Sequence, residues 1–230
     1  STTSPKDFKH YTKTFWKFFF YGLGAIMLFF LFASWGIFGS MPSFEDLENP
    51  DSNLATEVIS ADQVVIGKFF RENRSQLKYS DLPKNLVDAL VATEDERFYE
   101  HSGIDSLGTS GGASTLTQQL AKQLFHGEGS KFLPFRIVQK AKEWIIAIRL
   151  ERQYTKNEIL AMYCNVYDFG NYSVGVSSAA QTYFSKTPKE LTIDESAILV
   201  GMFKNSGLYN PVRNPQGVKN RRNVVLAQMQ

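Results

Sequence analysis

The sequence Glu-Asp-Glu-Arg-Phe-Tyr-Glu-His-Ser-Gly, residues 94–103, gathers carboxylates, aromatic rings and a histidine at the end of an apolar helical pattern. Shortly afterwards Gly-Ala-Ser-Thr-Leu-Thr-Gln-Gln, residues 112–119, places a glycine before the hydroxyl and amide side chains that start the next helical pattern. The free N–H groups of a helix start favour an anion, while hydroxyls and amides bind sugar hydroxyls and phosphate oxygens. Together the two segments predict a site for a sugar polymer.

A second feature lies near the N-terminus. No charged residue occurs from Phe18 to Phe38, where Phe, Leu, Ile, Gly and Ala predominate. Because about 20 apolar residues span a bilayer as a helix, residues 18–38 are predicted to form a transmembrane helix. Lysines precede this segment and acidic residues follow it, which places the N-terminus in the cytoplasm and the rest of the chain outside. A cleaved signal peptide would have a shorter apolar run, and a core helix is rarely apolar on every face.

Composition favours one globular domain behind this helix. Hydrophobic residues make up 43% of the 230 residues, which is ordinary for a protein with a packed core. The net charge of +2 argues against nucleic-acid binding, which requires a strongly basic surface. Cys164 is the only cysteine, so no intrachain disulfide can form. We expect a cytoplasmic segment at residues 1–17, the membrane helix at 18–38, a linker at 39–56 and the globular domain at 57–230.

The globular domain is predicted to be mainly α-helical with one small β-hairpin. Residues 57–70 alternate loosely between apolar and polar side chains, which is a hairpin pattern. Ser80 or Asp81, followed by Pro83, is expected to open a helix that reaches Glu94. Another helix is predicted at residues 136–152. Four more helices are predicted to begin at capping residues: Thr115 with Gln118, Thr155 with Glu158, Thr192 with Glu195, and Asn214 before Pro215.

Glu94 is the first candidate catalytic residue. At the rim of a cleft its carboxylate could take a proton from a sugar hydroxyl. Taken alone, Glu94 with Asp95 more often forms a solvated acidic helix end. His101 beside Gly103 is expected to fix a turn through hydrogen bonds rather than to transfer protons. These residues therefore need partners from elsewhere in the chain before they indicate catalysis.

The second segment and a later helix supply candidate ligands for a negatively charged group. Gly112 follows another glycine and lets the backbone approach a ligand closely. Lys140 and Glu143 lie three residues apart and share a helical face, although an isolated pair of this kind is more often a surface ion pair. The candidate substrate-binding side chains are hydroxyls, amides and cations: Ser114, Thr115, Gln118, Gln119, Lys122 and Lys140.

These segments together resemble the family 51 peptidoglycan glycosyltransferases, the lysozyme-like module of class A penicillin-binding proteins and of monofunctional transglycosylases. Residues 94–103 match the family pattern E-D-x-x-F-x-x-H-x-G, and residues 112–119 match G-x-S-T-x-T-Q-Q. Three further patterns follow in the family's order, and the likeness runs from about residue 82 to the C-terminus. They are residues 139–143 (Gln139 in place of arginine), 156–165 (Cys164 in place of leucine), and 209–211 with 221–226.

The resemblance implies an inverting transfer that polymerises lipid II into β-1,4-linked glycan strands, with undecaprenyl pyrophosphate as the leaving group. Glu94 would be the general base for the acceptor 4-hydroxyl. Glu143 would assist the pyrophosphate side, directly or through a divalent cation such as Mg²⁺ or Mn²⁺, and Lys122 and Lys140 would neutralise its charge. The motif residues with structural roles would be Asp95, Phe98, His101, Gly103 and Gly112. No organic cofactor is implied.

The resemblance also implies a location and partners. The chain would be a single-pass protein of the bacterial cytoplasmic membrane, with its catalytic domain outside the cytoplasm. Its partners would be lipid II, the growing glycan strand and the bilayer, and other cell-wall synthesis proteins are compatible with this location. The apolar residues 132–135 are a candidate membrane-facing surface, with a core-packed loop as the alternative.

Two other functions remain open from the sequence. A glycan-cleaving enzyme, either a lytic transglycosylase or a muramidase, could use the same fold and a glutamate at a helix end. Cleavage of a neutral glycosidic bond gives no reason, however, to gather Lys122 and Lys140 near Glu143. An inactive membrane-tethered scaffold would be consistent with the short connection at residues 104–111, because family members usually carry a longer segment there.

Overall fold

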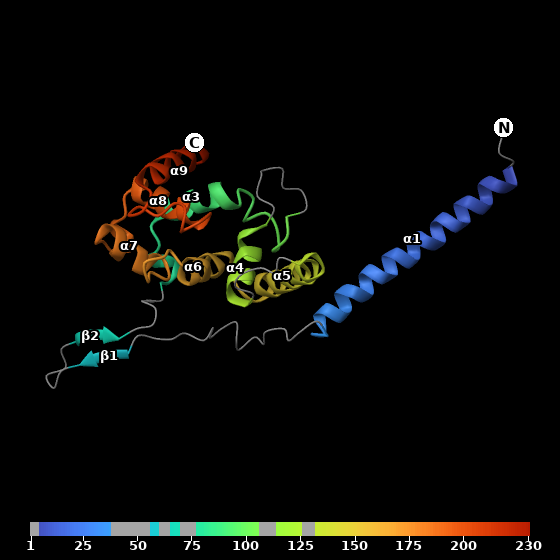
Figure 1. Cartoon of the computed structure of the whole chain (residues 1–230), viewed down its shortest axis with the longest axis horizontal. Helices are drawn as coiled ribbons and strands as arrows, with labels where there is room; N and C mark the ends of the chain where they lie inside the picture. The colour runs from blue at the N-terminus through green and yellow to red at the C-terminus, as the bar shows by residue number, and fades with distance from the viewer. Residues whose placement is uncertain (1–4, 38–55, 60–64, 70–76, 106–113, 126–131) are drawn as a thin grey trace.

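The computed structural model describes residues 5–37, 56–59, 65–69, 77–105, 114–125 and 132–230. A long helix, α1 (Pro5–Ser34), projects away from a helical domain built by the later elements (Figure 1). The domain contains α3 (Lys84–Glu94), α4 (Leu116–Phe125), α5 (Leu133–Gln153), α6 (Lys156–Val166), α7 (Val176–Phe184), α8 (Ile193–Phe203) and α9 (Pro215–Gln228). Short 3₁₀ turns lie at Tyr79–Asp81 and Pro188–Glu190. The mainly α fold predicted from the sequence is confirmed.

Two short strands precede the helical domain. Strand β1 (Thr56–Ile59) pairs antiparallel with β2 (Val65–Phe69), with Glu57 opposite Lys68. The residues between the strands, 60–64, lie outside the described part of the chain. The complete hairpin at residues 57–70 therefore stays a prediction, as do the predicted segment boundaries.

Helix α1 ends in a glycine turn. Gly36 has a φ of +76°, its N–H donates to the Ala33 carbonyl, and the N–H of Ile37 donates to the Phe32 carbonyl. This pairing satisfies carbonyls that the end of the helix would leave free, and a glycine takes the left-handed conformation at no steric cost. Within the described residues, Lys9–Ser34 is the stretch whose length and composition suit a membrane span. It overlaps the predicted segment 18–38 and begins earlier.

The domain is held together by two groups of helices that share one core. Helix α3 packs against α8 and α9, and α4 packs against α5 and α6. The rings of Tyr163 on α6 and Phe203 on α8 stack with centroids 4.8 Å apart, which joins the two groups.

Cys164, which stands where the family has leucine, is fully buried, and burial raises the pKa of its thiol to about 12. It is therefore an inert core side chain.

The predicted helix starts are confirmed at three places. Thr155 and Thr192 accept hydrogen bonds from the N–H groups of Glu158 and Glu195, whose side chains reach back to complete the boxes. Asn214 accepts from the N–H of Gly217 at 3.1 Å. Each contact satisfies an N–H group that a helix start leaves without an intrahelical partner.

Of the two other predicted helix starts, one is wrong and the other is formed only in part. Neither Ser80 nor Asp81 caps α3, because a 3₁₀ turn takes up both residues and Pro83 occupies the cap position without a side-chain hydrogen bond. Thr115 accepts from the N–H of Gln118 at 3.2 Å, but the Gln118 amide turns to the Gly103 carbonyl at 3.4 Å instead of completing a box. Helix α5 also begins at Leu133, before the predicted residue 136, with Pro134 in its first turn.

Asn165, near the end of α6, fastens the chain that enters the domain. Its side chain accepts from the N–H of Leu77 and donates to the Leu77 carbonyl, both at 2.9 Å. One amide thus satisfies both backbone groups of a residue 88 positions earlier in the chain. The contact links the start of the domain to the helix that carries Tyr163.

Replacing Asn165 by alanine removes both hydrogen bonds and leaves the Leu77 backbone groups to find other partners. We expect Asn165→Ala to lower the free energy of unfolding by about 1–3 kcal/mol, measured by denaturant titration. The matched control is Asn220→Ala, since Asn220 is exposed on α9 and accepts one bond from the side chain of Gln216. Equal stability of the two variants would contradict the structural role of Asn165.

Candidate active site

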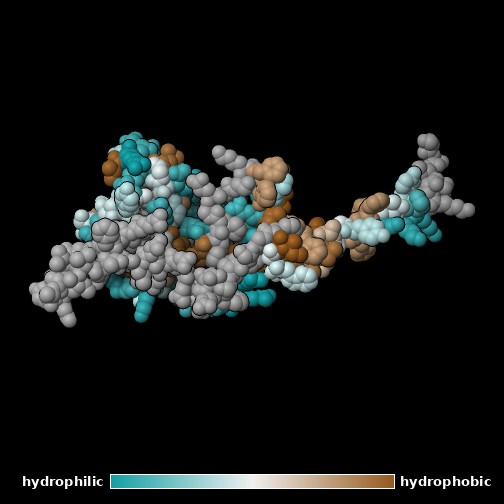
Figure 2. All heavy atoms as spheres, turned by 60° about the horizontal axis from the view of Figure 1, so that its bottom comes forward, coloured by the Kyte–Doolittle hydropathy of each residue, from teal (hydrophilic) through white to brown (hydrophobic). Residues whose placement is uncertain are grey.

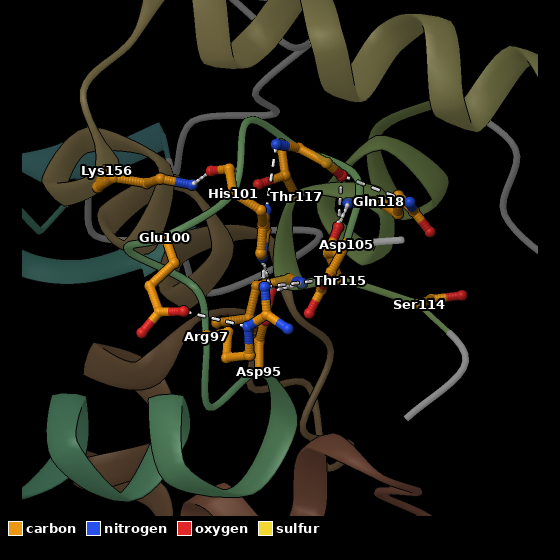
Figure 3. A network of polar contacts seen from close by, with 12 residues as sticks. Asp95, Arg97, Glu100, His101, Asp105, Ser114, Thr115, Thr117, Gln118 and Lys156 are labelled. Atoms are coloured by element: carbon orange, nitrogen blue, oxygen red, sulfur yellow. Dashed lines mark hydrogen bonds and ion pairs between the residues drawn. The ribbon is translucent and has the colours of Figure 1, made fainter. Parts of the chain in front are cut away.

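The carboxylate of Asp95 joins the end of α3 to the start of α4. Asp95 follows the last residue of α3, and its Oδ2 accepts from the N–H of Leu116, the first residue of α4, at 2.9 Å. The His101 Nε2 lies 3.0 and 3.1 Å from the two Asp95 oxygens (Figure 3). The His101 Nδ1 accepts from the N–H of Gly103, so Nε2 carries the proton and donates. His101 and Asp95 therefore have the structural arrangement expected from the sequence.

Gly103 lies directly against α5. Its φ is +88°, and a Cβ at this position would lie 2.9 Å from the Ala147 carbonyl oxygen. No side chain fits there without moving backbone atoms. The Gly103 carbonyl accepts from the Thr115 hydroxyl at 2.7 Å, which fixes the turn against the start of α4.

A partly buried cation supports the same turn. The Lys156 Nζ donates to the His101 carbonyl at 2.6 Å and pairs with Glu151 at 2.8 Å (Figure 3). It also lies 4.3 Å from the centre of the Phe98 ring, which is fully buried. The Thr117 hydroxyl donates to the same Glu151 oxygen at 2.6 Å. The first two motifs and the start of α6 thus form one connected polar network.

Glu94, at the end of α3, is held by two other helices. The Gln119 Nε2 on α4 donates to Glu94 Oε2 at 3.1 Å. The Arg221 Nη2 on α9 lies 3.8 Å from Oε1. The Glu94 side chain is 14% exposed, so the carboxylate keeps a route to solvent or substrate. A carboxylate with one firmly bonded oxygen and one more open oxygen is suited to accept a proton.

Lys140 on α5 forms a second polar centre. Its Nζ donates to the Ser114 hydroxyl at 2.6 Å and to the side-chain Oε1 of Gln118 at 3.4 Å, and it pairs with Glu143 at 3.1 Å. Glu143 is 6% exposed, whereas the Lys140 side chain is 36% exposed. The predicted pair is therefore not an ordinary surface ion pair, because the structure adds a hydroxyl and an amide from α4 and its start.

A cavity of about 630 Å³ lies between α4, α5 and the ends of α6 and α8. Lys122, which is exposed, lines it together with a second cation, Lys204, and the carboxylate of Glu143. Glu94 is not among its lining residues, but its partner Gln119 is. The lining residues are Ser114, Gln118, Gln119, Lys122, Gln123, Glu143, Val166, Tyr167, Asp168, Phe203, Lys204 and Ser206.

The structure thus brings most of the predicted site residues together. Ser114, Gln118, Gln119, Lys122 and Glu143 line one cavity, Lys140 bonds three groups at its edge, and Glu94 reaches it through Gln119. Thr115 is buried and bonded to Gly103, which suits a structural role better than substrate contact. Gly112 lies outside the described residues, as does most of the connection at 104–111.

Arg221 is a site residue that the sequence interpretation did not single out. Its side chain is 12% exposed, and its guanidinium is near Glu94 across the interface of α3 and α9. Its place in the final family pattern is a signal that could have drawn attention to it. The neighbouring Arg222 pairs instead with Asp194 at 3.6 Å, so adjacent arginines face different surroundings.

Replacing Asp95 by asparagine should loosen the junction of α3 and α4. The change removes the negative charge that faces the start of α4 and the buried His101, so we expect Asp95→Asn to lower the free energy of unfolding by about 1–3 kcal/mol. Asp88→Asn is the control, because the Asp88 side chain is 45% exposed and pairs with Lys84 on the surface of α3. Denaturant titration compares them, and an equal effect would disprove the junction role.

The chain is similar to several known proteins. The pattern of the family described as Transglycosylase matches residues 62–230. Penicillin-binding protein 1A from Vibrio cholerae is 38% identical over 202 residues, which cover 82% of this chain and 24% of that protein. Penicillin-binding protein 1A from Haemophilus influenzae is 39% identical over 186 residues, which cover 75% and 21%.

The crystal structure of the Haemophilus influenzae protein is 27% identical in sequence, covers 78% of this chain and 18% of that chain, and has a TM-score of 0.45. The chain spans about a quarter of the length of these curated relatives. Since the family pattern covers most of its residues, the chain belongs to the transglycosylase family.

Proposed function

We propose that the chain is a peptidoglycan glycosyltransferase that polymerises lipid II into β-1,4-linked glycan strands. The observation that carries this proposal is that Glu143 and Gln119, the residue that holds Glu94, line one cavity, and that Lys140 is bonded to Glu143 and Ser114 of this lining. A carboxylate base and a separate cationic centre are the two groups that transfer from a sugar pyrophosphate needs. Family membership and the relatives named above support the same assignment.

In the proposed reaction the acceptor 4-hydroxyl attacks the anomeric carbon of the donor sugar. The new carbon–oxygen bond forms as the bond to the pyrophosphate breaks, and the hydroxyl proton passes to Glu94. Gln119 fixes Oε2, so Oε1 is the oxygen that takes the proton, with the Arg221 charge 3.8 Å away. Attack opposite to the leaving group inverts the configuration at the anomeric carbon.

The leaving pyrophosphate would lie on the Lys140 side of the site. Lys140 and Lys122 supply positive charge, and the Ser114 hydroxyl, bonded to Lys140, can donate to a phosphate oxygen. Among the described residues there is no group of three or more His, Cys, Asp or Glu placed to hold a metal. Mg²⁺ is commonly held by one or two carboxylates together with substrate phosphates, and Glu143 fits that role. A divalent cation there would neutralise charge on the leaving group.

We further propose that α1 anchors the chain in the bacterial cytoplasmic membrane, with the N-terminus inside. Phe132, Leu133 and Phe135 at the start of α5 are 63–66% exposed, which favours the membrane-facing alternative over a core-packed loop. The ring of Phe30 on α1 stacks on that of Trp144 on α5, with centroids 6.2 Å apart. The brown apolar surface of α1 runs toward the domain in Figure 2. A lipid-linked substrate would reach the cavity from this surface.

A glycan-cleaving enzyme is the second candidate, and the same cavity argues against it. Cleavage of a neutral glycosidic bond gains nothing from Lys140 bonded to Ser114 and Gln118 beside a buried Glu143. An inactive scaffold would not need to keep Glu94 with one oxygen bonded to Gln119 and the other open. Incubation with lipid II, and separately with preformed glycan, distinguishes the candidates: polymer indicates transfer, fragments indicate cleavage, and neither product indicates a scaffold.

Replacing Glu94 by glutamine removes the proton acceptor while keeping its size. We expect Glu94→Gln to reduce the rate of lipid II polymerisation by about 10²–10⁴-fold, because general base catalysis contributes about that factor. Glu100→Gln is the control, since Glu100 lies on the turn after α3 with a side chain that is 68% exposed and pairs with Arg97. Polymerisation by Glu94→Gln at the native rate would exclude Glu94 as the base.

Replacing Glu143 by glutamine tests the leaving-group side. We expect Glu143→Gln to slow polymerisation and to raise severalfold the Mg²⁺ concentration that gives half-maximal rate, because an amide binds a divalent cation more weakly than a carboxylate. Glu158→Gln is the control, since Glu158 caps α6 away from the cavity. An unchanged Mg²⁺ dependence in Glu143→Gln would show that Glu143 holds no cation.

A further inference from the structure

Tyr163 on α6 is buried directly behind the candidate base. Its side chain has no exposed surface, and its hydroxyl donates to Gln119 Oε1 at 2.9 Å. The same Gln119 amide donates through Nε2 to Glu94 Oε2 at 3.1 Å and to the Ser114 carbonyl at 3.5 Å. A continuous path of hydrogen bonds therefore runs from the core through Gln119 to Glu94. Tyr163 does not line the cavity.

The path fixes which way the Gln119 amide points. If the amide were reversed, its carbonyl oxygen would face the Glu94 carboxylate, and two acceptors would oppose each other. The Tyr163 hydroxyl stabilises the productive orientation by donating to that oxygen. Without this donor, the amide is oriented only by the two groups to which it donates.

We propose that Tyr163 is a positioning residue for glycosyl transfer: its hydroxyl orients the Gln119 amide, and this amide orients the Glu94 carboxylate toward the acceptor hydroxyl. The inference rests on the proposed function. Tyr163 belongs to the fourth family pattern, and the inference assigns it an indirect role in the transfer reaction although Tyr163 contacts no substrate.

The core holds the Tyr163 hydroxyl in place. Its ring stacks on Phe203 with an interplanar angle of 25°, and Phe203 in turn is 5% exposed. Burial raises the pKa of Tyr163 well above its usual value and the Glu94 charge raises it further, while the Gln123 side chain acts in the opposite direction. The hydroxyl therefore stays protonated at neutral pH and remains a hydrogen-bond donor.

The test compares Tyr163→Phe, which removes one oxygen and keeps the ring, with the unmodified chain in lipid II polymerisation. We expect kcat to fall about tenfold with KM little changed, because no residue that lines the cavity is replaced and the base is less well aligned. Tyr183→Phe is the control. The Tyr183 hydroxyl makes two hydrogen bonds, to the Phe169 carbonyl and from the Asn210 amide, and it lies on α7 away from Glu94.

A double-mutant cycle separates positioning from a purely structural role. In a Gln119→Leu background, Tyr163→Phe should cause no further loss of kcat, because the hydroxyl acts only through the Gln119 amide. Additive losses, or a kcat for Tyr163→Phe equal to that of the control, would overturn the inference and leave the proposed function standing. Absence of polymerisation by the unmodified chain would overturn both. If Tyr163→Phe does not fold, the Gln119→Leu variant alone still tests the hydrogen-bond path. A kcat for Gln119→Leu equal to that of the unmodified chain would disprove the path.

Discussion

The hydrogen bond from the Leu116 N–H to the buried Asp95 carboxylate is the constraint on which the site depends. It joins the end of α3 to the start of α4, and His101 holds the same carboxylate from the other side. Glu94 is the residue before Asp95, and Gln119 is one turn into α4. The contact that makes the first two motifs a rigid unit therefore also sets the distance between the candidate base and the amide that orients it.

The other residues of the site form two groups that differ in charge. On the α3 side, Glu94 meets the neutral Gln119 and, farther off, the guanidinium of Arg221. On the α5 side, Lys140 and Glu143 share an edge of the cavity with Lys122. This division suits a reaction in which one group loses a proton while another departs with negative charge. The exposed apolar start of α5 lies on the same helix as Lys140, which connects the surface proposed to face lipid to the cationic centre.

Much of this arrangement could be predicted from the sequence. The mainly α fold, the capping boxes at Thr155 and Thr192, and the approach of the motif residues to one another follow from local patterns and from the family likeness. Contacts between distant segments could not be predicted in the same way. The failure of Asp81 to cap α3, the choice of Arg221 over Arg222 to face Glu94, and the burial of Tyr163 behind Gln119 depend on how whole helices pack. Periodicity does not encode those long-range relations.

The central claim is that Glu94 acts on the acceptor hydroxyl while the Lys140 centre acts on the pyrophosphate of the donor. The most direct test is the structure of the chain bound to an unreactive analogue of the lipid-linked disaccharide in both the donor and the acceptor position, with distances measured from each bound molecule to these groups. The account predicts the pyrophosphate within hydrogen-bonding distance of the Lys140 Nζ and the acceptor 4-hydroxyl within that distance of Glu94. A pyrophosphate bound away from Lys140, or an acceptor hydroxyl that faces another carboxylate, would contradict it.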